Sequence, residues 1–471
     1  MYGKEINCSG LHKDTYIYHY YKKNLFFNLH KEREDNNGVI ATVVEPRSTG
    51  GNGGNIEIHI NNMYLNKSFW ITSSTMGKGN SGDISIYAKG NVELKDAIDV
   101  DIWETSIYTS SFAGVNTASG NAGKIYLEAN NLLLKDGSNM GCGALSNYGK
   151  ETGDAGSIEV HVAGEIRLSG VNPEGCTYEY GNGNKYGSGF GAESTRDRSG
   201  DAGTIKVSAG NLILENGATI IAHTLGKSDG KHVDIKVDGK IQISGSEMLK
   251  VYKDDSYYFE ENFSGIYADS GSSNSDGGTS GNIELSANEV ILSDQGTIRT
   301  STEGGGHAGN IIINTNQLKL YNNASICSNS MSAKNGGAAG SISINSNHSV
   351  IMNNSMLTTE VVKNDPTNEH LNGKISLSSA NIYLIRSEIT TSVNNGTGDA
   401  GDININTSDA IVLNKSSIIA NAFEGTGGNI NIKAGQFVQS SDSKVDAVSK
   451  SEKGIDGKVY VKATDLDEKT V

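Results

Sequence analysis

The chain has 471 residues, of which 59 are glycine and only 3 are proline, and its hydrophobic fraction is 36%. A compact globular protein of this length would carry more apolar core, so the composition favours an elongated structure with a thin core. The net charge of −15 disfavours binding to nucleic acid or to anionic lipid, and no apolar run reaches the length of a membrane span.

Residues 1–37 match no later part of the chain, and we expect an irregular lead there. The first 23 residues, MYGKEINCSGLHKDTYIYHYYKK, lack the apolar core of a signal peptide. The stretch GVIATVV, from Gly38, resembles the last strand of a repeat whose first strands are missing. Neither end shows the polar cap that normally closes a solenoid, which favours a piece of a longer rod.

A glycine-rich motif recurs throughout residues 38–471. Examples are GNAGKIYLEANNLLL from Gly120, GHAGNIIINTNQLKL from Gly306 and GDAGDININTSDAIVL from Gly398. Thirteen copies align on the second glycine of this motif, and the repeat is about 28 residues long. The aligned positions are Gly54, Gly82, Gly123, Gly156, Gly203, Lys231, Gly281, Gly309, Gly340, Gly373, Gly401, Gly428 and Gly457.

A typical copy carries two pairs of apolar residues and then a single one. In the copy at Gly281 these are Ile283 and Leu285, Val290 and Leu292, and Ile298. A spacing of two is typical of a strand with one face inward. One copy cannot bury its own apolar face, whereas stacked copies can. The sequence therefore predicts an all-β fold, a right-handed parallel β-helix of about 13 coils with three strands per coil.

The polar turns of the repeat are interpreted as structural. Phosphate-binding glycine loops are followed by a helix, whereas a strand follows the glycines of every copy. Asparagines at turn positions are expected to point inward and to form stacked hydrogen-bond ladders. These asparagines are Asn131, Asn211, Asn288 and Asn316.

Three copies carry inserts between their second and third predicted strands, near residues 95–105, 169–188 and 244–264. The inserts are rich in aromatic residues, although such residues make up only 7% of the chain. Aromatic side chains on loops over a rigid scaffold can form a binding surface, or they can pack on the rod and on one another. The candidate surface residues are Trp103, Tyr178, Tyr180, Tyr186, Tyr252, Tyr257, Tyr258 and Phe259.

Nothing in the repeat predicts a catalytic, cofactor-binding or metal-ligating residue. A β-helix lyase or hydrolase would need clustered carboxylates. The outward positions three residues after the aligned glycine are instead mixed in type and not clustered. They include Glu57, Ser85, Tyr126, Glu159, Lys206, Asp234 and Glu284. Acidic residues do gather in the first and third inserts, where solvated loops or a calcium site would explain them.

The four cysteines follow no metal-binding spacing. Cys142 and Cys176 lie in neighbouring copies. A disulfide between them and two inert buried thiols are both left open by the sequence.

The tandem G-[ND]-A-G-x-I-x-[IV] units over residues 38–471 resemble the repeats of filamentous-haemagglutinin-like exoproteins. These are large bacterial adhesins, typically exported by two-partner secretion. The resemblance implies a location outside the cell or on its surface, and an outer-membrane two-partner transporter as export partner. A signal peptide and the secretion domain of this family are not visible in the chain.

Together these observations predict a structural and adhesive rod that is not an enzyme. We expect it to bind a host or matrix glycan or protein through the aromatic inserts, without nucleic acid, membrane insertion or cofactor. One alternative is a polysaccharide lyase or hydrolase on a β-helix scaffold. The other is a non-exported remnant of a larger adhesin gene.

Overall fold

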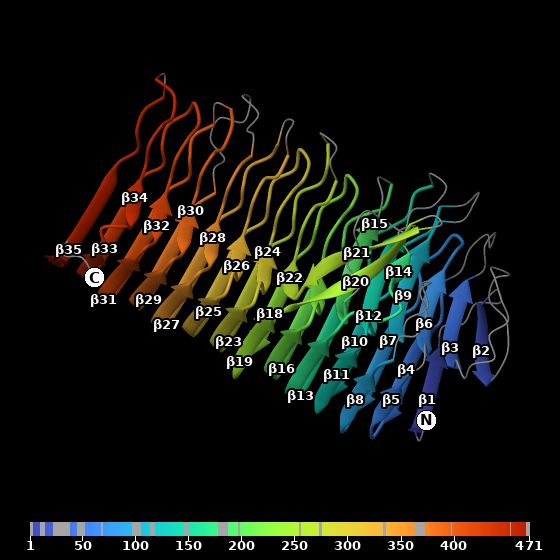
Figure 1. Cartoon of the computed structure of the whole chain (residues 1–471). Helices are drawn as coiled ribbons and strands as arrows, with labels where there is room; N and C mark the ends of the chain where they lie inside the picture. Colours follow the sequence, from blue (N-terminus) through green and yellow to red (C-terminus); the bar gives the residue numbers. More distant parts are fainter. Residues whose placement is uncertain are drawn as a thin grey trace. The chain divides into compact units, whose positions relative to one another are not determined.

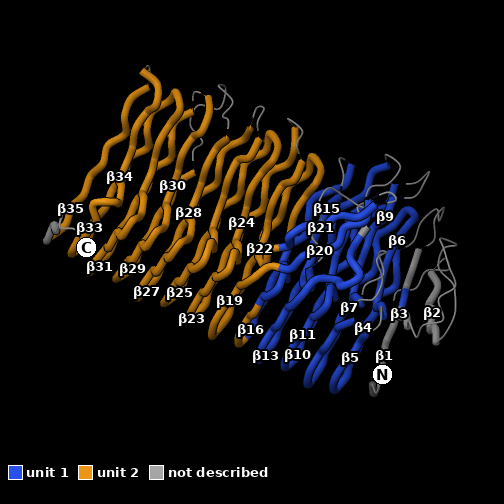
Figure 2. Tube along the Cα trace, in the orientation of Figure 1, with its two compact units in different colours: residues 1–209, 214–221, 247–262 blue, residues 210–213, 222–246, 263–471 orange. Residues whose placement is uncertain are grey.

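The computed structural model describes residues 3–9, 15–21, 38–44, 52–66, 69–96, 105–113, 118–145, 150–177, 187–195, 198–253, 256–272, 276–332, 336–362, 373–396, 398–452 and 454–467. The regular secondary structure of these residues is all β-strand. The chain divides into two compact units, shown in Figure 2. Unit 1 comprises residues 1–209, 214–221 and 247–262, and unit 2 comprises residues 210–213, 222–246 and 263–471. Each unit is by itself a parallel β-helix, as the repeat predicts.

Unit 1 stacks its coils through three parallel ladders (Figure 1). The first ladder contains β4 (Asn55–Ile60), β7 (Ile84–Ala88), β10 (Ile125–Ala129) and β13 (Ile158–Ser169). The second contains β5 (Met63–Leu65), β8 (Asn91–Leu94) and β11 (Asn131–Lys135), which joins the far end of β13. The third contains β3 (Gly38–Val44), β6 (Trp70–Thr75), β9 (Ser106–Phe112), β12 (Asn139–Leu145), β15 (Gly189–Thr195) and β17 (Thr219–Ile221). β16 (Ile205–Glu215) contributes residues to both units.

In unit 2 the first two predicted strands of most coils merge into one long, bent strand. The unit starts with β18 (Val233–Val237) and β19 (Lys240–Ser244), which both pair with β23 (Ile283–Ser293). The ladder continues through β25 (Ile311–Tyr321), β27 (Ile342–Asn353), β29 (Ile375–Ile385), β31 (Ile403–Asn414), β33 (Ile430–Gln439) and β35 (Val459–Asp467). The third-strand ladder contains β22 (Gly265–Tyr267), β24 (Thr297–Arg299), β26 (Ser325–Cys327), β28 (Met356–Thr358), β30 (Glu388–Thr390), β32 (Ser417–Ile419) and β34 (Lys444–Asp446).

The core consists of the apolar positions that the repeat predicts. In the coil of β23 and β24 the five predicted core residues are all 0% exposed: Ile283, Leu285, Val290, Leu292 and Ile298. Each pairs in register with the same position of the next coil, for example Ile283 with Ile311 and Val290 with Leu318. Like side chains therefore stack on one another, and the thin core continues from coil to coil.

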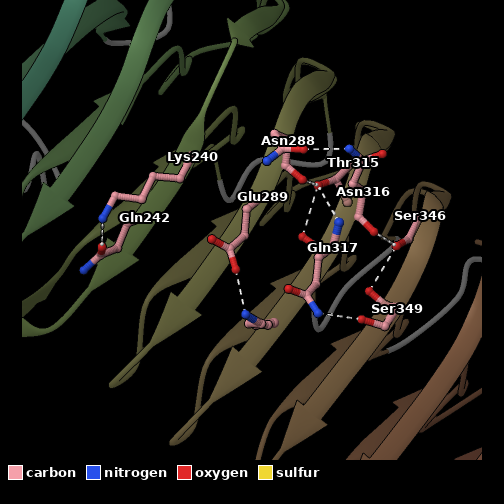
Figure 3. Close-up of polar contacts among 10 residues, drawn as sticks. Lys240, Gln242, Asn288, Glu289, Thr315, Asn316, Gln317, Ser346 and Ser349 are labelled. Atoms are coloured by element: carbon pink, nitrogen blue, oxygen red, sulfur yellow. Dashed lines mark hydrogen bonds and ion pairs between the residues drawn. The ribbon is translucent and has the colours of Figure 1, made fainter.

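Polar residues occupy the bend of β23, β25 and β27, as Figure 3 shows. Asn316 donates from Nδ2 to Oδ1 of Asn288 at 2.6 Å, and Thr315 donates to the backbone oxygen of Asn288 at 3.1 Å. The predicted asparagine ladder is present, but its predicted inward direction is wrong. Asn288 and Asn316 are exposed, because the residue before each of them takes the inward position at the bend. Asn131 and Asn211 are half-buried.

The conserved spacing of the glycine-rich motif has a structural reason. A Cβ atom added at Gly203 would lie 1.6 Å from the backbone oxygen of Gly156 in the preceding coil, so no side chain fits there. Two residues before this glycine, a carboxylate or amide accepts a hydrogen bond from the next coil. The backbone N–H of Asp201 donates to Oδ1 of Asp154 at 2.9 Å, and that of Asp154 donates to Oδ1 of Asn121 at 3.0 Å. The motif therefore extends the ladder beyond the strands.

The segment before the first repeat adds two antiparallel strands. β1 (Gly3–Ser9) pairs antiparallel with β4, and β2 (Thr15–Tyr21) pairs antiparallel with β3. These strands occupy hydrogen-bonding edges of the first coil that would otherwise be open to pairing with another chain.

Three cysteines are free, buried thiols: Cys142, Cys176 and Cys327. Burial raises the pKa of the Cys142 thiol to about 12, so this group is an inert core thiol and not a nucleophile.

Candidate functional site

The second and third inserts meet in a small sheet of unit 1. β14 (Cys176–Thr177) belongs to the second insert, and β20 (Ser246–Lys253) and β21 (Ser256–Phe263) belong to the third. β14 pairs in parallel with β20, so that Cys176 lies opposite Val251. The three strands form a sheet of their own, which we call the insert sheet, and they run in a different direction from the coil strands (Figure 1).

The inner face of the insert sheet is apolar. Val171, Cys176, Leu249 and Val251 form a separate buried cluster. The carboxylate of Glu247, in β20, also accepts a hydrogen bond from the backbone N–H of Val171. These contacts give the inserts a fixed position on unit 1.

Two further contacts hold the insert sheet against the turn of the coil between the two inserts. The Asn262 amide donates to the backbone oxygen of Gly217 at 2.7 Å. Gly217 has a φ of 84°, and a Cβ atom there would lie 2.8 Å from the Val171 side chain. The close approach at this turn therefore requires glycine.

The outer face of the insert sheet carries the aromatic residues. The ring centres of Tyr252 and Tyr257 lie 6.0 Å apart. Those of Tyr257 and Phe259 lie 5.8 Å apart, and the two rings meet edge to face. The Lys250 ammonium lies 4.5 Å from the centre of the Tyr252 ring and 4.4 Å from that of Tyr257. A hydrogen bond with Tyr252 raises the Lys250 pKa, so the cation persists at neutral pH. We call these four residues the aromatic patch.

The aromatic patch is open to solvent. Tyr257 and Phe259 are each 57% exposed, and Met248 of β20 is 54% exposed. On the other face of the sheet, Leu249 and Val251 pack against Val171 and Cys176, and the rings take no part in that cluster. Tyr252, Tyr257 and Phe259 nevertheless contact one another, so the structural explanation left open by the sequence, in which the rings pack together, is met in part.

The structure places only part of the predicted surface. Tyr252, Tyr257 and Phe259 come together, and Tyr258 lies between the last two in the sequence of β21. Trp103, Tyr178, Tyr180 and Tyr186 lie outside the described residues. The sequence analysis missed Lys250 and Met248. The alternation along β20 was the available signal, because it places both on the same face as Tyr252.

A second cluster, also missed from the sequence, is a column of four rings on the outer face of the first ladder of unit 1. The column consists of His59, Tyr87, Tyr126 and His161, with successive ring centres 4.7, 5.4 and 5.4 Å apart. His161 also contacts Ser208 at 2.7 Å and Glu159 at 3.0 Å. Tyr126 is one of the outward positions three residues after the aligned glycine, whereas the other three rings lie five residues after theirs, on the same face of the ladder. The rings stack on one another, which makes the column a stabilising feature.

A third cluster lies on the third-strand ladder of unit 2. Asp269 accepts from Nη2 and Nε of Arg299 at 2.6 and 2.8 Å, and from the backbone of Ser301 at 2.7 Å. The guanidinium of Arg299 lies 4.9 Å from the centre of the Tyr267 ring. The attraction of Asp269 raises the Arg299 pKa, and burial raises that of Tyr267. Arg299 is thus held as a structural cation.

Two carboxyl groups on this side of unit 2 have a raised pKa. Burial raises the pKa of Glu303, against the opposing effect of Arg299. Burial and the nearby Glu388 raise the pKa of Glu360. Carboxyl groups with a raised pKa are one requirement for acid catalysis, although structural groups can be shifted in the same way.

Within the described residues, no three His, Cys, Asp or Glu side chains are placed to hold a metal ion. The acidic pair Asp254 and Asp255 of the third insert lies outside these residues, as do Asp99, Asp101 and Glu104 of the first. Over the same part of the chain, no helix is long and apolar enough to cross a membrane.

Comparisons of this chain with protein-family models, with curated proteins and with solved structures found no match.

Proposed function

We propose that the protein is an adhesive parallel β-helix without catalytic activity, which binds the protein surface of a partner through the aromatic patch. The observation that carries this proposal is the exposed patch, held in place by the buried aliphatic cluster on the opposite face of the same sheet. A rigid scaffold that presents pre-ordered aromatic side chains loses little entropy on binding.

The composition of the patch favours a protein partner over a glycan. Tyr257, Phe259 and Met248 are apolar and more than half exposed, and tyrosine, phenylalanine and methionine are enriched at protein interfaces. Lys250, the charged group of the patch, is already engaged with two rings. A glycan needs several directional hydrogen-bond partners, which this surface does not offer.

A location outside the cell forms part of the proposal. Its support is the resemblance of the repeats to filamentous-haemagglutinin-like exoproteins, which also suggests export through a two-partner outer-membrane transporter. The fold agrees with a structural rod, since stacked coils present many surface positions on a regular core.

The test is binding of the purified full chain to a panel of immobilised extracellular-matrix proteins and polysaccharides. The test variant combines Tyr257→Ser and Phe259→Ser, and the matched control is Tyr64→Ser, which replaces a 63% exposed tyrosine elsewhere on unit 1. We expect binding to at least one protein surface, reduced at least tenfold in the double variant and unchanged in the control. Unchanged binding by the double variant would refute the role of the patch, and binding to polysaccharides alone would refute the protein partner.

The alternative left by the sequence analysis is a carbohydrate-active enzyme, and on unit 2 the carboxyl groups to test are Glu303 and Glu360, whose pKa burial raises. Incubation of the chain with acidic and neutral polysaccharides, followed by measurement of new reducing ends, tests it. Turnover that is lost in Glu360→Gln would support the enzyme, and no turnover would leave the adhesive rod as the function.

A further inference from the structure

A shallow, open hollow lies on the outer face of unit 2, over the strands β27, β29, β31, β33 and β35, whose stacking Figure 1 shows. Most of its lining residues are polar, although more of its exposed surface is apolar than polar. Its volume is about 400 Å³, within the range of small-molecule sites. The lining residues are Asn345, Ser376, Leu377, Ser378, Asn404, Ile405, Asn406, Asn431, Lys433 and Tyr460.

The register between coils arranges these side chains in two rows. One row runs through Ser376, Asn404, Asn431 and Tyr460, and the other through Asn345, Ser378, Asn406 and Lys433. Neighbouring members of a row are one strand spacing apart, about 4.8 Å. The hollow therefore offers a repeating line of amide and hydroxyl groups across several coils.

Some of these side chains are bonded to a neighbouring coil, and others have no partner among the described residues. Asn431 donates to Asn404 at 3.2 Å, and Asn345 donates to Asn314 at 3.0 Å. No hydrogen bond or ion pair with another described residue engages the side chains of Ser378, Asn406 and Lys433, which line the hollow. The amide contacts between coils therefore cover only part of the two rows, and the side chains of Ser378, Asn406 and Lys433 face solvent.

An aromatic ring borders the polar rows. Tyr460 is 54% exposed and lies next to Asn431 in register. An exposed ring can stack against the apolar C–H face of a sugar, while the amides and hydroxyls donate to and accept from its hydroxyl groups. An amide side chain can both donate and accept a hydrogen bond, and a sugar hydroxyl group does the same.

The charged side chains in the lining indicate which net charge a ligand of this hollow would carry. No carboxylate lines it, so the lining has no anionic group that would attract a cationic ligand. Lys433 is the single cation of the lining, whereas acidic polymers are usually bound by clusters of basic residues. The lining suits an uncharged ligand with many hydroxyl groups.

We propose that this hollow is a binding site for a neutral polysaccharide chain. It stands on different residues from the aromatic patch, in the other unit, and does not depend on the function proposed for that patch.

The experiment is affinity electrophoresis of the full chain in gels that contain dextran, laminarin or galactomannan as neutral probes, with heparin and chitosan as charged probes. The test variants are Asn406→Ala and Tyr460→Ala. The controls are Asn347→Ala, an exposed asparagine outside the lining, and Tyr383→Ala, a part-exposed tyrosine on the second leg of β29. Circular dichroism verifies that each variant is folded.

We expect retardation by at least one neutral polysaccharide. Each test variant should weaken it about fivefold, the effect of one lost hydrogen bond or stacking contact, and each control should stay within about twofold. Three outcomes would overturn the proposal: no retardation by any neutral probe, stronger retardation by heparin or chitosan, or equal retardation of the test variants and the wild-type chain.

Discussion

The substitution Gly203→Ala tests the idea that the glycine-rich motif exists to let coils approach. The added Cβ atom would lie 1.6 Å from the backbone oxygen of Gly156, whereas ordinary contact begins at 3.4 Å. The two coils would have to separate locally by about 1.8 Å, a large part of the strand spacing of about 4.8 Å.

The cost follows from the contacts that this separation would break. The backbone N–H of Ala155 donates to Asp201 at 2.9 Å, and that of Ile158 donates to Thr204 at 2.9 Å. Two lost hydrogen bonds and the overpacking give a local destabilisation of about 2–4 kcal/mol. This corresponds to a loss of hydrogen-exchange protection of about 30-fold to several hundred-fold.

The assay is hydrogen exchange with mass spectrometry on peptides that cover residues 153–160, because long repeat arrays do not unfold in two states. The matched control is Gly191→Ala in unit 1. There the nearest atom to the new Cβ is the flexible carboxylate of Glu193 at 2.8 Å, and the next lies at 3.6 Å. Both substitutions replace a glycine by an alanine, so both lower the conformational entropy of the unfolded chain by the same amount. Full protection in Gly203→Ala, or an equal loss in both variants, would refute the reasoning.

Three further outcomes are expected. Leu249→Ala should loosen the insert sheet by about 2–5 kcal/mol, seen as faster protease cleavage within residues 246–263, and uniform cleavage of the whole chain would argue against a separate sheet. The raised pKa of Glu360 means that its contribution to stability is present below the ordinary value of 4.5 and is lost as the pH rises through the raised pKa. Glu360→Gln should therefore resist denaturant better than the wild type at pH 7 and equally at about pH 4, and the opposite order at pH 7 would contradict this sign. Asp269→Asn should destabilise unit 2 by about 1–3 kcal/mol, because it leaves the part-buried Arg299 without its charged partner, and an unchanged denaturation midpoint would count against the pair.

The functional surface could be predicted only in part. Tyr252, Tyr257 and Phe259 stood out because aromatic residues are rare in this chain, and the structure brings them together. Lys250 was missed because its role depends on two rings, one of which belongs to the next strand. The polar hollow was missed for a similar reason, since its members are spread over five coils and look like ordinary surface residues in each.

The sequence by itself determined the parallel β-helix, because a two-residue spacing and an apolar pair recur along thirteen copies, and a close-contact glycine recurs in twelve of them. It did not determine which way the corner asparagines point, since a shift of one residue at the bend reverses the face. Only the tertiary structure decided that β14 pairs with β20, that four rings form a column and that the amide rows line a hollow. Each of these depends on the register between strands far apart in the chain, which hydrogen bonds and packing between coils set and local spacing does not encode.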